Sequence, residues 1–256
     1  MEGTPAIADL RRAAGLLRTA QHAVALTGAG LSTPSGIPDF RSPGSGLWEH
    51  YDSMAVASLI AFRYNPDRFY EWVRPLALRI LNAEPNAAHR ALARLEAAGL
   101  IIGVVTQNID DLHHRAGSVH VLEIHGHLRQ ATCVSCYRLF PLQEFLPDFL
   151  SSGKTPHCPR CGAILKPNVV LYGEQLPLQV VHQAQAWMDS SDLVLVIGSS
   201  LEVTPAAAFP LRALDAGAHL IIVNHEPTYL DERADLIFRQ CVTEVLPRLA
   251  CEVLGD

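Results

Sequence analysis

Four short apolar runs divide the chain, and each has the length and composition of a buried parallel strand. All are rich in Val, Ile and Leu and end in small or polar residues, and they cover residues 23–28, 100–106, 193–199 and 220–224. Between them, apolar side chains recur at helical spacing over residues 6–20 and 86–98, with Asn86 as a suitable N-cap and Gly99 as a stop. This alternation predicts an α/β fold with a doubly wound parallel sheet.

The stretch from residue 128 to residue 166 breaks this pattern. Cys, Pro, Gly and Ser accumulate there, and we see no strand run. We therefore predict a small module inserted into the larger domain. A second stretch, residues 48–79, is rich in aromatic residues, has helical spacing in places and carries no strong strand signal.

Two Cys-x-x-Cys pairs lie inside the inserted stretch, separated by 21 residues. Cys133 and Cys136 form the first pair, and Cys158 and Cys161 form the second. Two such turns can place four thiolates around one zinc ion, and a closed shell of this kind is structural rather than catalytic. The alternatives are disulfides, which the expected compartment disfavours, and a redox Cys-x-x-Cys motif, which does not come in such pairs.

A glycine-rich loop follows the first apolar run. Gly28, Ala29 and Gly30 begin like a dinucleotide-binding fingerprint, but Thr33 stands in place of the third glycine and a proline follows. The loop therefore cannot continue as a regular helix, although its glycines would let backbone amides approach a pyrophosphate. An ordinary strand-to-helix turn is an equal alternative.

Three residues further along favour the cofactor interpretation. These are Asp39, Phe40 and Arg41. A phenylalanine ring can stack on a ligand ring, and an arginine can neutralise phosphate charge.

Polar side chains also follow the second apolar run. Gln107, Asn108 and Asp110 lie where ligands bind in open α/β sheets, beyond the carboxyl ends of the strands. Buried amides and carboxylates need hydrogen-bonding partners, and an amide-bearing cofactor such as nicotinamide would supply them. A simple helix N-cap by Asp110 is the alternative.

One histidine stands apart from its neighbours. His125 ends a short apolar run and precedes Gly126. A lone histidine in this setting is ordinarily structural, but its position between the polar cluster and the first cysteine pair makes it a candidate catalytic group. His113 and His114 have no comparable setting, and we expect them to be solvated or structural.

The bulk composition narrows the functional classes. The chain has 256 residues, of which 49% are hydrophobic, and a formal net charge of −6. No run of Lys and Arg stands out, so direct nucleic-acid binding is not expected. No apolar run is long enough to span a membrane and no secretory signal is visible, so we expect a cytoplasmic protein.

Taken together, these motifs closely resemble those of the sirtuin family, in the family's order. They extend from about residue 23 to residue 245, nearly the whole chain. The segments are GAGLSTPSGIPDFRS, TQNIDDLHHRAG, EIHGHL, the two Cys-x-x-Cys pairs, LKPNVVLYGEQLP, IGSSLEVTPAA and IIVNHEPT.

The resemblance implies a Rossmann-like NAD-binding domain with a small inserted zinc-binding domain, and an active site between them. The larger domain would comprise residues 1–47, 87–127 and 172–256. The small domain would combine a helical module, residues 48–86, with a zinc-ribbon module, residues 128–171.

The resemblance also implies residue roles. His125 would be the catalytic base, assisted by Asn108 and Asp110, and the acylated peptide would lie beside Val170 and Tyr172, pairing as an added strand. The implied NAD contacts are Gly28, Ala29, Gly30, Ser32, Thr33, Asp39, Phe40, Arg41, Gln107, Asn108, Ile109, Asp110, His125, Gly198, Ser199, Ser200, Asn224, Cys241 and Val242.

The implied reaction removes an acyl group from lysine in proteins or peptides. The acyl oxygen attacks the ribose carbon as nicotinamide leaves, and His125 acts as general base on the ribose hydroxyls. Water completes the reaction and releases lysine, nicotinamide and O-acyl-ADP-ribose, so NAD is a consumed co-substrate and zinc is only structural.

One departure bears on the acyl group. The branch of the family that removes acidic acyl groups carries a Tyr-x-x-Arg pair, and Val73 and Leu76 occupy the matching positions here. Tyr70 and Arg74 lie nearby at a different spacing. We therefore expect neutral groups, acetyl or longer aliphatic, rather than succinyl.

Three other functions share some of these features. ADP-ribosyl transfer to a protein would use the same pocket, but the intact His125 and NVVLYGE segment favour deacylation. A non-catalytic NAD sensor or zinc-dependent interaction module would not need Asn108 and Asp110 beside that histidine. A hydride-transferring dehydrogenase is disfavoured by the broken glycine fingerprint.

Overall fold

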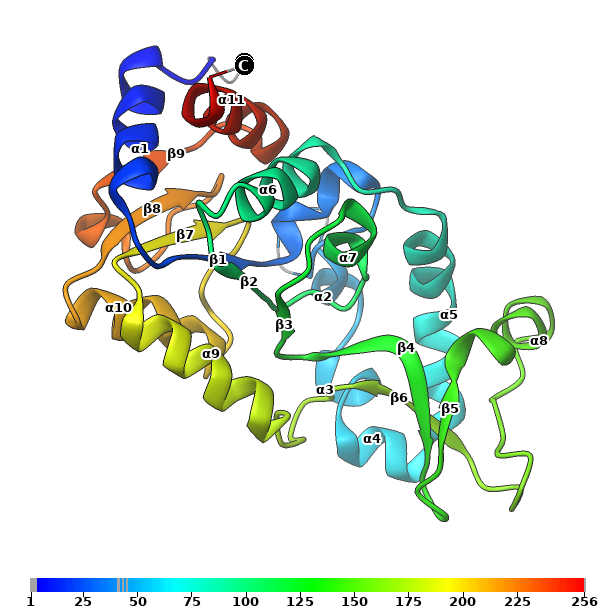
Figure 1. The fold of residues 1–256 in the computed structure, drawn as a ribbon. Helices are drawn as coiled ribbons and strands as arrows, with labels where there is room; N and C mark the ends of the chain where they lie inside the picture. The colour runs from blue at the N-terminus through cyan, green and yellow to red at the C-terminus, as the bar shows by residue number, and fades with distance from the viewer. Residues whose placement is uncertain (1–3, 41, 43, 45, 256) are drawn as a thin grey trace.

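The computed structural model describes residues 4–40, 42, 44 and 46–255, and it contains two β-sheets with helices packed around them (Figure 1). The strands are β1 (Ala23–Thr27), β2 (Gly103–Thr106), β3 (Val121–Glu123), β4 (Gly126–Cys133), β5 (Leu139–Pro141), β6 (Leu165–Val169), β7 (Leu193–Ile197), β8 (His219–Val223) and β9 (Leu236–Phe238). The α-helices are α1 (Ile7–Thr19), α2 (Leu47–His50), α3 (Ser53–Val56), α4 (Leu59–Tyr64), α5 (Pro66–Asn82), α6 (Ala87–Ala97), α7 (Leu112–Ala116), α8 (Leu146–Ser152), α9 (Leu178–Ser190), α10 (Phe209–Asp215) and α11 (Val242–Leu254).

The larger sheet confirms the predicted Rossmann-like fold class. Its six strands are all parallel, in the order β3-β2-β1-β7-β8-β9. The chain builds outward from β1 in one direction and then from β7 in the other, so the order reverses between these two strands. Ligands of open α/β sheets bind in the crevice at such a switch point.

Helices cover both faces of this sheet, which is why its strands are continuously apolar. Ala23 and Ala25 of β1 pack towards α1, α6 and α11, whereas Val24 and Leu26 pack towards α9 and α10. The two sets alternate along the strand because successive side chains point to opposite faces. The two cores anchor the strand ends that carry the polar loops.

The predicted helix 86–98 appears as α6, with Asn86 as its N-cap. The Asn86 side-chain oxygen accepts hydrogen bonds from the backbone amides of Ala88 (2.9 Å) and His89 (3.3 Å). The imidazole of His89 completes a capping box with the Asn86 amide. This end of α6 is therefore fixed beside the glycine-rich loop.

The expectation that residues 128–166 lack strands is wrong. These residues contribute to an antiparallel sheet in the order β5-β4-β6. Half of β4 is polar or exposed, and β6 contains Pro167, so neither strand has an apolar run. Pro167 is tolerated because β6 is an edge strand.

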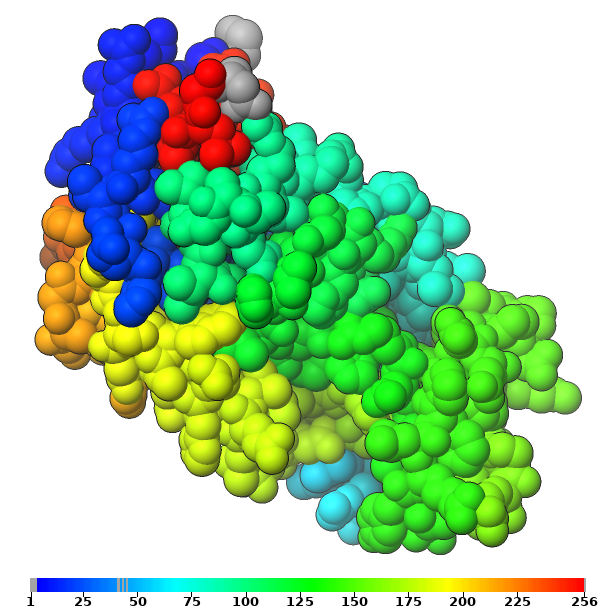
Figure 2. All heavy atoms as spheres, viewed as in Figure 1, coloured from blue at the N-terminus to red at the C-terminus, as the bar shows by residue number. Residues whose placement is uncertain are grey.

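The small sheet packs against α5 and α8 through a cluster of aromatic side chains. Phe69 and Tyr70 of α5 make edge-on contacts with Phe62 and Phe149, with ring centroids 5.2–5.3 Å apart. The residues of this part of the chain form one end of the molecule, and α1 and α11 lie at the other (Figure 2). Within the described residues, no helix combines the length and apolarity needed to cross a bilayer.

Candidate active site and zinc centre

Close backbone contact joins the loops after β1 and β7 at the switch point. The Gly30 amide donates to the Gly198 carbonyl at 2.9 Å. A Cβ on Gly30 would lie 2.9 Å from the Gly198 Cα, and a Cβ on Gly198 (φ 59°) would lie 2.2 Å from the Leu31 nitrogen. Gly28 is equally restricted, because a Cβ there would meet the Gly198 carbonyl at 2.7 Å. These glycines are required for two loops to share one crevice.

The glycine-rich loop does not continue as a regular helix, as predicted. It forms two 3₁₀ turns, Ala29–Leu31 and Thr33–Ser35, and Gly36 ends the second at φ 87°. The Thr33 hydroxyl donates to the Gly30 carbonyl at 3.1 Å. The loop is therefore held by its own short-range hydrogen bonds and by the Gly198 contact.

A buried polar network lies directly beneath this loop. The Ser32 hydroxyl donates to the Asp110 carboxylate at 2.6 Å and accepts from the Asn108 side-chain amide at 3.1 Å. The same amide donates to the Gly28 carbonyl at 3.0 Å. All three side chains are buried. The predicted residues of the two polar segments are thus brought together, and their amide and hydroxyl orientations are fixed.

Asp110 also supports the start of α7. Its second carboxylate oxygen accepts from the Leu112 backbone amide at 3.0 Å. This bond fits the helix-cap interpretation of Asp110, and it leaves the other carboxylate oxygen in the buried network with Ser32. Burial raises the pKa of the Asp110 carboxyl, while its hydrogen bonds to Ser32 and Leu112 oppose that shift.

A second buried network connects the carboxyl ends of β1 and β2. The Thr27 hydroxyl donates to the Thr106 hydroxyl at 2.8 Å and lies 2.9 Å from Nε2 of His113. Thr106 in turn accepts from the Asn108 backbone amide at 3.1 Å. The rings of His113 and His89 lie edge to face, 5.1 Å apart. Burial lowers the pKa of both imidazoles, that of His89 to about 4.

His125 lies at the end of β3 with one ring nitrogen oriented by the backbone. Its Nδ1 is 3.0 Å from the Gln107 carbonyl. A carbonyl only accepts, so Nδ1 carries the proton and Nε2 is the nitrogen with the lone pair. Gly126 follows at φ 76°, and a Cβ there would lie 2.0 Å from the Asn168 carbonyl. Only glycine lets β4 approach β6 so closely.

Gln107 links this histidine to the loop after β7. Its side-chain amide donates to the Ser199 hydroxyl at 2.8 Å, and that hydroxyl also accepts from the Leu201 amide at 3.3 Å. Ser200 follows in the same loop and is half-buried. Ile109, on the other side, packs against the aromatic cluster of the small sheet.

Phe40 belongs to a row of aromatic rings that the sequence did not reveal. Its ring stacks on Trp48 with centroids 5.2 Å apart, and Trp48 in turn contacts Trp72 (5.6 Å) and Tyr172 (6.1 Å). Asp39 stabilises the same loop by accepting from the Ser42 amide at 2.7 Å. Arg41 lies outside the described residues. The sequence did not indicate that Trp48 belongs to the site, because aromatic composition alone does not show which rings will be in contact.

The remaining predicted NAD contacts lie at the ends of β8 and β9. The Asn224 side-chain amide donates to the Glu226 carbonyl at 2.8 Å. Cys241 is the N-cap residue of α11, and Val242, its first residue, is buried. These residues lie on the other side of the switch point from Asn108 and His125, because β8 and β9 follow β7 in the sheet.

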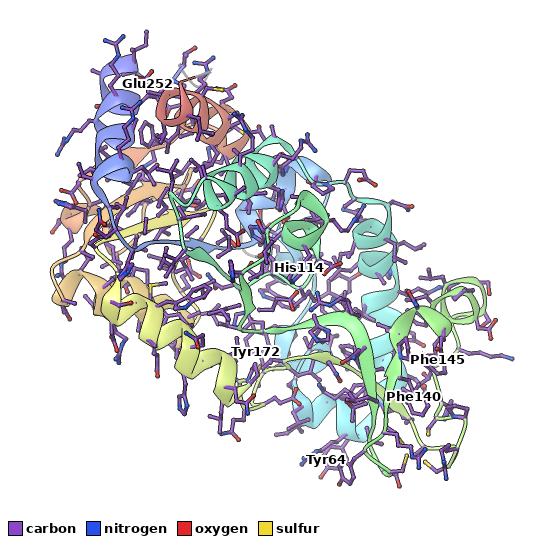
Figure 3. All side chains as sticks on the ribbon, viewed as in Figure 1. Tyr64, His114, Phe140, Phe145, Tyr172 and Glu252 are labelled. Atoms are coloured by element: carbon purple, nitrogen blue, oxygen red, sulfur yellow. The ribbon has the colours of Figure 1, made fainter. Side chains whose placement is uncertain are left out.

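The segment after β6 runs between the two parts of the molecule. The Val170 amide donates to the His125 carbonyl at 2.8 Å, and the Tyr172 amide donates to the Ala57 carbonyl at 2.9 Å. Figure 3 shows Tyr172 between the large and the small sheet. Val170 therefore lies directly beside the candidate base, whereas Tyr172 is bonded to the segment before α4.

The four predicted zinc ligands come together at one end of the small sheet. Their sulfurs all lie within 4.8 Å of one another, with Cys133 and Cys161 at 3.4 Å and Cys136 and Cys158 at 3.7 Å. Sulfurs at the corners of a tetrahedron around zinc are about 3.8 Å apart. The donor set therefore fits one zinc ion.

Each cysteine pair is followed by a residue in the left-handed conformation. Gly162 follows the second pair at φ 75°, and Tyr137 follows the first at φ 58°. The two turns thus have matching backbones, and each reverses the chain after presenting two sulfurs.

Comparison with known proteins agrees with this geometry. The Sir2 family profile matches residues 28–205. An NAD-dependent protein deacylase 2 of Archaeoglobus fulgidus is 45% identical over 246 residues, covering 96% of both chains. An NAD-dependent protein deacetylase of Caldivirga maquilingensis is 44% identical over 245 residues, covering 96% of this chain and 94% of the other.

Solved structures give the same result. One, described as the structural basis for the mechanism and regulation of Sir2 enzymes, superposes with a TM-score of 0.91 at 44% identity and covers 97% of this chain and 98% of that one. Sir2Tm bound to a propionylated peptide superposes with a TM-score of 0.86 at 38% identity, covering 96% and 98% of the two chains. Matches of this extent to one family's profile, sequences and structures mean that the chain belongs to the Sir2 family.

Proposed function

We propose that this protein is an NAD-dependent protein-lysine deacylase that removes neutral acyl groups and transfers them to ADP-ribose. One observation carries the proposal: a histidine of defined tautomer lies beside a buried Ser32–Asn108–Asp110 network at the switch point of a dinucleotide-binding sheet. The activities for which its relatives are named support the same conclusion.

The crevice between β1 and β7 suits NAD. The glycines bring the two loops into contact, and the 3₁₀ turn Ala29–Leu31 would lie beside a bound pyrophosphate. Asn224 and Val242, beyond β8 and at the start of α11, would hold the adenosine end. When bound, NAD supplies the ribose carbon that receives the acyl oxygen as nicotinamide leaves.

Asp110 and Asn108 would form the nicotinamide end of the site. The nicotinamide of NAD is cationic, and a buried carboxylate is a suitable partner because its charge is weakly screened there. Ser32 holds the carboxylate by hydrogen bonding and keeps the Asn108 amide in one orientation. The pocket is therefore ordered before the ligand arrives.

His125 would be the general base. With Nδ1 donating to the Gln107 carbonyl, Nε2 is the atom that accepts a proton from the ribose hydroxyls. The deprotonated oxygen then attacks the carbon of the acyl group. Because Gln107 also bonds Ser199, the histidine is connected to the loop after β7.

The acylated peptide would pair along the segment from Val170 to Tyr172, extending a short sheet edge. The aromatic row of Phe40, Trp48 and Tyr172 would then lie beside the acyl-lysine side chain and limit access of bulk solvent to it. A relative in the same family has been solved with a propionylated peptide, which supports a neutral acyl group as substrate.

The surroundings of α5 support a preference for neutral acyl groups. Val73 lines an apolar cavity next to Leu128, and Leu76 is buried in a neighbouring apolar cluster. Arg74 is directed away, donating to the carbonyls of Leu150 and Ser151 at the end of α8. Tyr70 donates to the Leu165 carbonyl. Neither side chain of this pair is available to bind an acidic acyl group.

The zinc ion would have a structural role and no catalytic role. Its four thiolates close the coordination shell, so no position remains for a substrate or a catalytic water. The centre would hold β4, β5 and β6 together and thereby position the Val170–Tyr172 segment. The domain boundaries predicted from the sequence remain part of this proposal.

The test is nicotinamide release by purified protein given NAD and peptides carrying acetyl, propionyl or succinyl lysine. We expect release only with an acylated peptide, fastest with a neutral group. His125→Ala should reduce kcat at least about a hundredfold, the low end of the effect of a general base, while NAD still binds. Release without peptide, or a His125→Ala variant with full turnover, would contradict the proposal.

A further inference from the structure

Asp111 has a backbone conformation that is unusual for its residue type. Its φ is 66° and its ψ is 6°, in the left-handed region, which glycine adopts more readily than other residues. It stands directly between Asp110, whose carboxylate belongs to the buried network, and the first residue of α7. With Asp111 in this turn, the Asp110 carboxylate reaches both the Ser32 hydroxyl and the Leu112 amide.

An ion-pair cluster fixes the Asp111 side chain from the neighbouring strands. Arg129 of β4 bonds the Asp111 carboxylate through one guanidinium nitrogen and binds both carboxylate oxygens of Glu123 from β3, one at 2.7 Å. Glu123 is only 10% exposed, so the cluster is anchored on its inner side. His114 lies at its edge, 3.9 Å from Glu123 (Figure 3).

The cluster crosses the boundary between the large and the small sheet. Asp111 lies in the segment after β2 and Glu123 is the last residue of β3, and both strands belong to the large sheet. Arg129 lies on β4 of the small sheet. The guanidinium is planar and bidentate, so it fixes direction as well as distance. These ion pairs hold the pKa of Arg129 above its usual range.

We propose that Arg129 is a positioning residue for the nicotinamide end of the site. It holds Asp111 in the left-handed conformation and thereby keeps the Asp110 carboxylate and the start of α7 in register. The inference rests on the proposed function only for the identity of the ligand.

A comparison of two substitutions isolates the backbone effect. Asp111→Gly and Asp111→Ala both remove the carboxylate, but only glycine adopts φ 66° without strain. We expect Asp111→Gly to keep the KM for NAD near that of the unmodified enzyme. Asp111→Ala should raise it about fivefold, because alanine is strained in the left-handed conformation, with a smaller change in kcat and none in the peptide KM.

Arg129→Ala should raise the KM for NAD in the same way, and the double variant Arg129→Ala with Asp111→Gly should restore it. A matched control is Arg212→Ala, which breaks a bidentate pair with Asp189 at 2.6–2.9 Å on the exposed side of α9 and α10. That variant should leave both KM values unchanged. Melting temperature and zinc content, measured on every variant, identify any that fails to fold.

Direct calorimetric titration of NAD into the zinc-loaded variants gives a readout that needs no turnover. If Asp111→Gly binds NAD as weakly as Asp111→Ala, the carboxylate itself matters and the inference is overturned. The inference also fails if the double variant remains as weak as Arg129→Ala. Absence of nicotinamide release by the unmodified enzyme would instead contradict the proposed function and leave the binding comparison intact.

Discussion

The switch-point crevice and the cysteine centre reach a fixed geometry by different means. In the crevice, residues far apart in the sequence meet through backbone contact and hydrogen bonds, as Ser32 does with Asp110. In the cysteine centre, two short local turns each present two sulfurs, as Cys133 and Cys136 do. The crevice depends on the whole folded sheet, whereas the centre would depend on one zinc ion.

This difference predicts whether a substitution in each region affects mainly activity or mainly folding. The large sheet has apolar cores on both faces, so a change in the crevice alters chemistry more than folding. The small sheet has three strands, with a small apolar cluster around Leu142 and Leu165 on one side and the aromatic cluster of α5 and α8 on another, so a bound zinc ion would add to the stability of its cysteine end.

Loss of zinc should have the largest effect. Chelation, or replacement of Cys133 and Cys158 by serine, should release the metal, unfold β4 to β6 and reduce deacylation more than about a hundredfold, because zinc binding is folding free energy in such modules. Hydrogen exchange should show rapid exchange across β4 and β6 while β1 and β7 stay protected. Cys251→Ser, outside the cluster, is the control, and a zinc-free protein with full activity would refute the role.

Acidification should have a smaller effect, confined to the crevice. Burial raises the pKa of Asp110, so its carboxylate is neutralised at a higher pH than an ordinary aspartate. A neutral acid cannot pair with a cationic ring, and the KM for NAD should rise as pH falls through this raised value. Steady-state kinetics across pH would measure it. The same pH dependence in Asp110→Asn would show that another group is responsible.

The smallest effect should be a loss of stability in acid from the buried histidines. His89 has its pKa lowered to about 4 in the fold, whereas an exposed imidazole titrates near 6.5. The unfolded chain therefore binds more protons between these values, and stability falls as pH drops from about 6.5 to about 4. His89→Gln, which can keep the capping box, should flatten this slope in thermal melts. An unchanged slope would exclude His89 as its source.

The sequence predicted those parts of the structure that depend on local pattern. Three features have a short-range signal in the sequence and lie where expected. They are the strand β1 before the glycine-rich loop, the N-cap Asn86 and the four clustered cysteines. The strands β4 and β6 were not predicted, because Pro167 and the polar residues of β4 interrupt the apolar pattern that would indicate a strand.

Long-range partners could not be predicted for a physical reason. Nothing local in the sequence indicates that Ser32 would accept from Asn108, that Trp48 would contact Tyr172, or that Arg129 would reach Asp111. Such contacts arise only when the sheet order and the connection between the two sheets are fixed. The candidate base was suggested by its position, but its tautomer required the Gln107 carbonyl.

The fate of the acyl group tests the central claim most directly. An acetyl-lysine peptide carrying a ¹³C-labelled acetyl group, incubated with NAD and the zinc-loaded protein, should yield one labelled acetyl-ADP-ribose for each nicotinamide and each free lysine, measured by mass spectrometry. His125→Ala should lose that product while retaining NAD binding. Label that remains on the peptide, or ADP-ribose attached to protein in place of the acyl product, would contradict the account.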